Sequence, residues 1–160
     1  MKDTFTQAVR LGIIMLILAI VLGWADKFIF EPGRIPACVQ ETLPEGRICM
    51  ETISSRFQNR VVWVDARSQS DFELNHLMLP ENRMFPIRKG PQLQQQIDAA
   101  IGRLLEAAEK SECIVVFCTA ECTASEEIAT ELRELGMIDA PIFTLHGGWE
   151  ALKASGMTID

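Results

Sequence analysis

Short apolar runs alternate with helical patterns along most of this chain, and this alternation constrains the fold more than any other feature. The apolar runs cover residues 61–64, 84–87, 113–117 and 142–145, and the helical patterns cover residues 68–74, 91–108, 125–135 and 149–154. Runs that are apolar at every position are typical of strands buried on both faces, and the intervening helices connect parallel strands. The sequence therefore predicts an α/β fold with a parallel sheet, in which ligands bind beyond the carboxyl ends of the strands.

Length and composition exclude several classes of protein. The chain has 160 residues, 48% of them apolar, which is enough for one domain with a proper core. Its 15 basic and 22 acidic residues give a formal net charge of −7, so we expect no nucleic-acid binding. The cysteines and the two histidines show no spacing typical of a zinc site, so we expect no metal.

The N-terminal segment differs from the rest of the chain. Residues 11–25 carry no charge, and apolar neighbours extend this run over residues 8–30. Trp24 and Phe28 follow a pattern typical of the membrane interface. Three interpretations stay open: a single transmembrane helix within residues 1–30 that anchors the protein in the lipid bilayer, a signal peptide cleaved after Ala25, and a buried core helix.

Charges beside the apolar run favour one orientation. Lys2 and Arg10 precede the run, and positive residues collect on the cytoplasmic side of a membrane span. We therefore expect a single-pass membrane protein whose domain lies on the non-cytoplasmic side. If the segment is instead a cleaved signal, the domain is secreted or periplasmic.

A linker follows the apolar segment. Residues 31–46 contain three prolines and two glycines and show no period, so we expect an irregular connection. Cys38 lies in this linker, and Cys49 follows it at the start of the next segment. In an oxidising compartment the two can form a disulfide, whereas the alternative is two free thiols.

The candidate nucleophile is Cys118, which directly follows the apolar strand at residues 113–117. A short loop, residues 119–124, separates it from the next helix. A cysteine at such a strand-to-helix turn is expected to face backbone N–H groups and the positive end of the helix dipole, and both stabilise the nucleophilic thiolate. The alternative is a small buried residue that ends a core strand.

Four stretches of the chain occur in an order typical of one family. They are Val-Asp-Ala-Arg at 64–67, Asp-Phe-Glu-Leu-Asn-His-Leu at 71–77, the strand and cysteine at 114–118, and Leu-His-Gly-Gly-Trp-Glu-Ala-Leu at 145–152. With these motifs, residues 47–156 resemble the rhodanese-like single-domain sulfurtransferases, and we expect the rhodanese-like domain to span residues 47–160. Asn75 and Leu77 depart from the family pattern, which has glycine and isoleucine there.

The resemblance implies a doubly wound parallel sheet with helices on both faces and a sulfurtransferase that needs no cofactor. Cys118 would carry a sulfane sulfur as a persulfide, taken from a sulfane-sulfur donor and passed to a thiol acceptor. The resemblance assigns substrate binding to the loop residues Thr119, Ala120, Glu121, Cys122, Thr123 and Ala124.

The loop departs from the family pattern in its charge. Glu121 and Thr123 stand where the family has glycine and arginine, and no cation lies between Thr119 and Ser125. We therefore expect weak activity with doubly charged thiosulfate, unless Arg88 or Lys89 brings a cation from elsewhere in the fold. Cysteine phosphatases require an arginine six residues after the cysteine, and Ala124 at that position argues against their chemistry.

A second cysteine in the same loop opens an alternative function. Cys122 lies four residues after Cys118, within reach of the Cα separation of ~5.5–6 Å that a disulfide requires. It is therefore a candidate resolving thiol. The two alternatives to a sulfurtransferase are a non-catalytic rhodanese-like module that binds a protein partner, and a thiol redox protein that uses Cys118 and Cys122.

Overall fold

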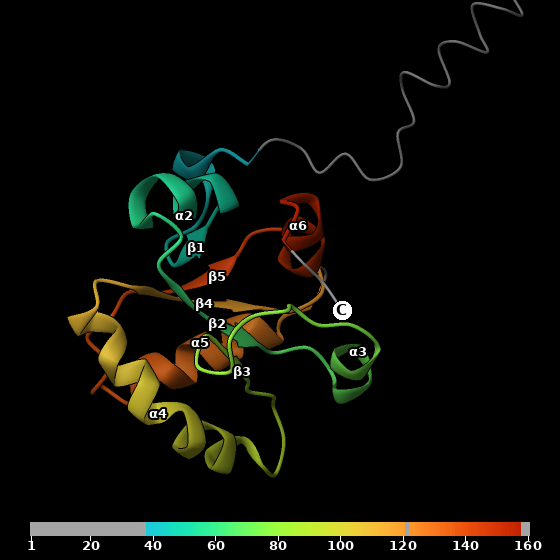
Figure 1. Ribbon diagram of the computed structural model, residues 1–160, viewed down its shortest axis with the longest axis vertical. Coiled ribbons are helices and arrows are strands. Elements are labelled where there is room, and N and C mark those ends of the chain that lie inside the picture. The colour runs from blue at the N-terminus through green and yellow to red at the C-terminus, as the bar shows by residue number, and fades with distance from the viewer. Residues whose placement is uncertain (1–37, 121, 158–160) are drawn as a thin grey trace, which may run out of the picture. The chain divides into compact units, whose positions relative to one another are not determined.

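A computed structural model describes residues 38–120 and 122–157 of the chain (Figure 1). The anchor or signal segment predicted over residues 1–30 lies outside these residues, as does the first part of the linker. The lipid-bilayer contact expected for residues 8–30 therefore stays a prediction. Among the described helices, none is long and apolar enough to span a membrane.

Parallel strands form a single sheet in the order β1-β5-β4-β2-β3. Their bounds are β1 Arg47–Ile48, β2 Val61–Asp65, β3 Met84–Pro86, β4 Cys113–Phe117 and β5 Ile142–Leu145. The strands predicted from the apolar runs are confirmed, and so is the parallel α/β class. β1 was not predicted because a two-residue strand is too short to show a pattern.

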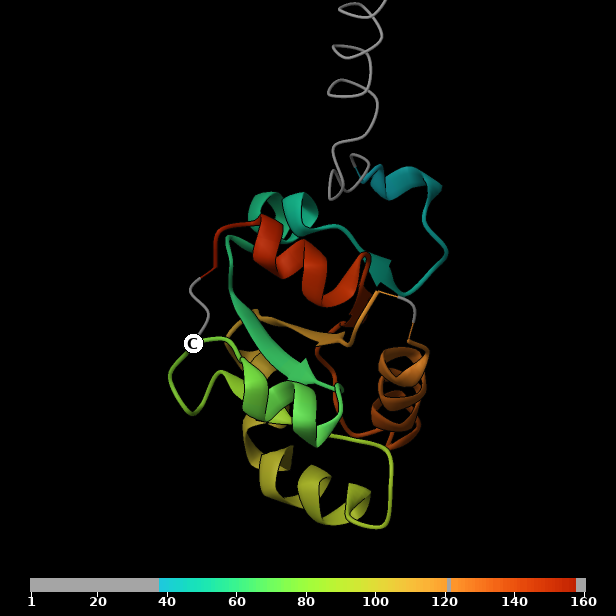
Figure 2. The ribbon, with the colours of Figure 1, turned by 90° about the vertical axis from the view of Figure 1, so that its right-hand side faces the viewer.

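Helices cover both faces of this sheet. Their bounds are η1 (a 3-10 helix) Gln40–Thr42, α2 Met50–Phe57, α3 Gln69–Leu74, α4 Leu93–Glu109, α5 Ala124–Glu134 and α6 Gly148–Ala154. α4 and α5 pack on one face, and α2 and α6 pack on the other (Figure 2). The sheet is therefore doubly wound, as the family resemblance implied.

The central strands β2 and β4 divide their side chains between two cores. The side chains that face α4 and α5 are Val62, Val64, Ile114 and Val116, and those that face α2 and α6 are Val61, Trp63, Val115 and Phe117. All of them are buried. Because both faces are covered, neither strand alternates between apolar and polar residues, which is why each appears in the sequence as an unbroken apolar run.

The helix ends follow local chemistry. α3 begins after Ser68, whose Oγ accepts a hydrogen bond from the N–H of Asp71 at 3.1 Å. α4 begins at Leu93 rather than at Pro91, since residues 91–92 form a turn. α5 is followed by Gly136 in the left-handed conformation (φ +64°), the helix stop that the sequence predicted.

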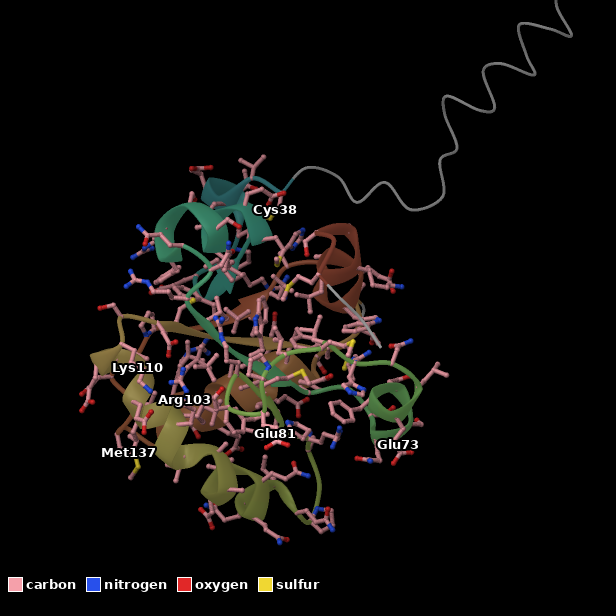
Figure 3. All side chains as sticks on the ribbon, viewed as in Figure 1. Cys38, Glu73, Glu81, Arg103, Lys110 and Met137 are labelled. Carbon is pink, nitrogen blue, oxygen red and sulfur yellow. A yellow bond between two sulfur atoms is a disulfide. The ribbon has the colours of Figure 1, made fainter. Side chains whose placement is uncertain are left out.

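The described part of the predicted linker, residues 38–46, is attached to the domain. A disulfide joins Cys38 to Cys49 with a Cα–Cα distance of 5.7 Å (Figure 3). The side-chain amide of Gln40 donates a hydrogen bond to Arg47 O and accepts one from the N–H of Cys49, both at 2.9 Å. From Cys38 onward the chain is thus tied to the edge of the sheet at β1.

Candidate active site

The site lies at the carboxyl edge of the sheet, where all strands end because all are parallel. β4 occupies the middle of the sheet and ends directly in Cys118. The loop that follows leads into α5, so the strand-to-helix turn predicted from the sequence is present. The neighbouring strand ends bring Ala66 and Arg67 from β2 and His146 from β5 to the same edge.

The backbone of Cys118 is held by the N-terminus of α6. The N–H of Trp149 donates a hydrogen bond to Cys118 O at 2.8 Å. Gly148 passes this carbonyl so closely that a Cβ atom there would lie 2.2 Å from the oxygen, and its φ of +51° is itself suited to glycine. The Gly-Gly-Trp motif therefore fixes the residue that carries the candidate nucleophile.

A buried ion pair between Asp65 and Arg67 contacts both the end of α3 and Trp149 at the start of α6. Arg67 Nη2 donates to Asp65 Oδ2 at 2.7 Å and to Asn75 O at 2.9 Å. The guanidinium carbon of Arg67 lies 3.6 Å from the ring centroid of Trp149. Both charged side chains are fully buried. The Asp-x-Arg motif therefore supports the end of α3 and the start of α6, and its role is structural.

Two carbonyl oxygens and both the hydroxyl and the backbone of Ser125 lie around the Cys118 thiol. Its Sγ lies 3.2 Å from Thr119 O, 3.0 Å from Cys122 O and 3.5 Å from the hydroxyl of Ser125. A thiol can donate its proton to such oxygens, whereas a thiolate is repelled by two carbonyl dipoles. In this conformation the loop favours the protonated form.

Burial raises the pKa of Cys118 to about 11 from an ordinary value of 9.0. Hydrogen bonding to Ser125 lowers this pKa, and interaction with Cys122 raises it. The raised pKa runs against the sequence-based expectation of an ionised thiol, whereas the backbone hydrogen bond from Ser125 agrees with it. The physical reason for the raised pKa is that the side chain is only 2% exposed and faces carbonyl oxygens.

Cys122 has the opposite environment. The residue is exposed, and its Sγ accepts a hydrogen bond from the N–H of Ala124 at 3.3 Å. This N–H belongs to the first turn of α5, where unpaired amides and the helix dipole attract negative charge. The first turn of α5 therefore contacts both cysteines, through the backbone of Ser125 at Cys118 and through the N–H of Ala124 at Cys122.

Two cavities flank the loop, and Cys122 lines both of them. The first, of about 400 Å³, also contains Arg47, Glu126, His146 and Glu150. The second, of about 860 Å³, also contains Arg67, Arg88 and Lys89, with no carboxylate among its described lining residues. Cys118 is not among the described residues that line either cavity.

The six loop residues assigned to substrate binding divide between these cavities. Thr119 and Ala120 line the first cavity, Ala124 lines the second, and Cys122 lines both. Thr123 lines neither cavity. Glu121 lies outside the described residues.

Arg88 is the available cation of the second cavity. Arg67 is paired with Asp65, and Lys89 forms an ion pair with Glu127. Within the described residues, Arg88 has no carboxylate partner, and its Nη2 is buried without a hydrogen bond. Burial lowers the pKa of Arg88, while the charge of Asp65 raises it. The guanidinium remains charged at neutral pH, because its ordinary pKa is far above 7.

Sequence reasoning missed two residues of the site. Ser125 was taken only as the start of a helix, although its hydroxyl lies against the nucleophile, and a serine in the first turn after a cysteine loop was the available signal. The close approach of Gly148 to Cys118 had no signal beyond the paired glycines. Among the described residues, no group of three or more His, Cys, Asp or Glu side chains is placed to hold a metal.

The fold and the site define an α/β domain that presents a cysteine in the turn between a central strand and a helix. The sequence pattern described as "Rhodanese-like domain" matches residues 51–155, which is more than half of the chain. The protein therefore belongs to the rhodanese-like family. No curated protein is similar enough to count as a relative.

Two solved structures resemble the chain at low identity. A protein from Lactobacillus plantarum is 18% identical, with a TM-score of 0.49, over 72% of this chain and 87% of its own. The BH2092 protein from Bacillus halodurans is 15% identical, with a TM-score of 0.44, over 71% of this chain and 75% of its own. The family assignment does not depend on these two likenesses.

Replacing Gly148 by alanine should disrupt the site, because the new methyl group would collide with Cys118 O. We expect the free energy of unfolding to fall by at least about 3 kcal/mol. Gly156→Ala is the matched control, since Gly156 has a similar φ of +77° but open space around it. That variant should lose only about 1–2 kcal/mol. Urea denaturation of both variants measures the difference, and equal losses would contradict the proposed contact.

Alkylation of Cys118 by iodoacetamide should be slow at neutral pH, because the thiol with a pKa of about 11 is almost entirely protonated there. The rate should rise about tenfold per pH unit from pH 7 and level off only near pH 11. Peptide mass spectrometry measures the rate at each cysteine, with Cys113 as a buried control whose pKa is raised to about 12. A plateau of the Cys118 rate at or below pH 8 would show that the thiol is ionised.

Proposed function

We propose that this protein is a sulfurtransferase that carries a sulfane sulfur as a persulfide on Cys118. The observation that carries the proposal is the place of this thiol. It lies at the end of the central strand, enclosed by the loop, by Ser125 and by the start of α6. A sulfur atom added to Sγ in this position is shielded from solvent and from oxidants, and membership of the rhodanese-like family supports the same chemistry.

The chemistry requires only thiol–disulfide exchange. The Cys118 sulfur attacks the outer sulfur of a persulfide that is brought to it, the sulfur–sulfur bond of that persulfide breaks, and its inner sulfur leaves as a thiol with the proton that Cys118 gave up. An acceptor thiol later takes the sulfur by the same exchange, so no oxidant is consumed. The hydroxyl of Ser125 stabilises the thiolate as it forms, since hydrogen bonding to it lowers the pKa of Cys118.

The second cavity supports the binding of an anionic donor. From the loop alone we expected weak activity with thiosulfate, unless another part of the fold brings a positive charge to the site. Arg88 is such a cation. It follows β3 in the chain and lines the second cavity, and it has no carboxylate partner among the described residues. We propose that its guanidinium attracts the negative end of the donor.

We also propose that residues 8–30 tether the domain to a lipid bilayer, with the domain on the non-cytoplasmic side. The uncharged run at residues 11–25 supports the tether. The Cys38–Cys49 disulfide supports the location, because disulfides persist in oxidising compartments. Cleavage after Ala25 would instead release a secreted or periplasmic domain.

Exposure of the full chain to glutathione persulfide should add the mass of one sulfur atom to the protein. The added sulfur should be removed by excess thiol and should map to Cys118 in alkylated peptides. The Cys118→Ala variant should hold no persulfide that survives purification, while Cys113→Ala, which changes a buried cysteine on the same strand, should behave as the unmodified protein. Intact-mass spectrometry measures the sulfur content.

The same measurement separates the two alternative functions. A protein-binding module would gain no sulfur and would keep all its thiols unchanged. A thiol redox protein would lose two hydrogens under mild oxidation and form a disulfide between Cys118 and Cys122. The distance of 3.0 Å between Cys118 Sγ and Cys122 O favours this second candidate. Stable sulfur on Cys118 without that linkage supports the transferase.

The Arg88→Gln variant should react more slowly with thiosulfate, because the cavity loses its unpaired cation. A charge-assisted hydrogen bond contributes about 1.5–3 kcal/mol, so we expect the second-order rate to fall roughly tenfold to a hundredfold. The rate with tert-butyl persulfide, which lacks a sulfonate group, should change little. Lys89→Gln is the matched control, since Lys89 lines the same cavity but is paired with Glu127. Equal effects of the two variants would contradict the role of Arg88.

A further inference from the structure

The two loop cysteines differ in the properties that a nucleophile needs. Cys118 is 2% exposed, faces two carbonyl oxygens and lines neither cavity among the described residues. Cys122 is exposed, lines both cavities and accepts a hydrogen bond from the first turn of α5. A donor that enters either cavity therefore meets the Cys122 sulfur.

We propose that Cys122 is the thiol that first receives the sulfur and that it relays this sulfur to Cys118. The inference rests on the proposed sulfurtransferase function and adds a second catalytic residue to it. It also assigns the donor a binding place, the cavity that Cys122 shares with Arg88. The ligand class is an organic persulfide or another anion that carries a sulfane sulfur.

The backbone around Cys122 supports the first step. The N–H of Ala124 donates to Cys122 Sγ at 3.3 Å, so a negative charge that develops on this sulfur is stabilised by an amide and by the α5 dipole. The loop is closed by a hydrogen bond from the N–H of Cys122 to Thr119 O at 3.1 Å. This turn presents the Cys122 side chain at the junction of the two cavities.

Direct attack by Cys118 on a donor is disfavoured twice. The residue is covered by the loop, by Ser125 and by α6, so a donor has no path to its sulfur in this conformation. Its pKa of about 11 also leaves the thiolate fraction at pH 7 roughly 100-fold below that of a cysteine with the ordinary pKa of 9.0. A persulfide on Cys122 removes the problem of access, because it offers its sulfur to Cys118 from within the same loop.

The two residues are close enough for the second step. Cys118 Sγ lies 3.0 Å from Cys122 O, and the interaction between the two side chains is strong enough to raise the pKa of Cys118. Sulfur transfer requires the two Sγ atoms to approach within about two sulfur–sulfur bond lengths, each about 2.05 Å. The relay therefore requires rotation about the two Cα–Cβ bonds to bring the sulfur atoms together.

The relay balances in atoms and electrons. In the first step the Cys122 sulfur attacks the outer sulfur of R–S–SH, the donor bond breaks, and R–SH leaves with the proton that Cys122 lost. In the second step the Cys118 sulfur attacks the outer sulfur of the Cys122 persulfide. The new bond forms on Cys118, the bond to Cys122 breaks, and Cys122 takes up the proton that Cys118 gave up. Neither step consumes an oxidant or a reductant.

The test follows the sulfur in time in the full chain, with glutathione persulfide as the probe. Samples are quenched by alkylation at short intervals, and peptide mass spectrometry locates the persulfide. In the unmodified protein we expect sulfur on Cys122 first and on Cys118 later. In Cys118→Ser the sulfur should reach Cys122 and go no further, so that it is found only in samples quenched while the donor is present and is lost on purification from the exposed Cys122. Cys122→Ser keeps an acceptor for the N–H of Ala124 and should slow the loading of Cys118 by roughly tenfold or more.

Two results would overturn the relay while leaving the transferase intact. One is loading of Cys118 at an unchanged rate in Cys122→Ser, and the other is a Cys118→Ser variant that takes up no sulfur at Cys122. Absence of sulfur from every cysteine of the unmodified protein would instead refute the proposed function and the relay with it. Cys113→Ala serves as the control for the loss of a thiol, because Cys113 is buried away from the loop on the face of α2 and α6.

Discussion

The hydrogen bond from the N–H of Trp149 to Cys118 O is the contact on which the site depends. It joins the end of the central strand to the start of α6, and only a residue without a Cβ atom, Gly148, allows the two backbones to come so close. Arg67 lies against the Trp149 ring and pairs with Asp65, so the end of β2 is fixed to the same point. The position of the nucleophile is therefore determined by backbone contacts that lie outside its own loop.

The loop itself determines the ionisation of the thiol. The family pattern places glycine and arginine in this loop, and this chain has Glu121 and Thr123 at those positions. In the described backbone two carbonyl oxygens face the Cys118 sulfur, and the first-turn amide of Ala124 contacts Cys122. Positive charge reaches the site from the segment after β3, through Arg88, rather than from the loop.

Much of the fold was predictable because the sheet is buried on both faces. β2, β4 and β5 appear in the sequence as apolar runs, and parallel topology then places Cys118 at the carboxyl edge. β1 and α2 were not predicted, since the strand has only two residues and the helix buries only Ile53. The raised pKa of Cys118 was not predicted, because the burial of a loop side chain and the backbone atoms that face it depend on loop dihedral angles that leave no periodic signal.

A persulfide carrier has two requirements that one cysteine cannot meet together. The sulfur must be reached by a donor, which demands exposure, and the persulfide must be kept from further oxidation, which demands burial. Cys118 meets the second requirement and fails the first, whereas Cys122 is exposed at the junction of two cavities. In the proposed relay the chain separates the two requirements over two loop residues, and Cys118 receives its sulfur from within the same loop, without having to be reached by the donor.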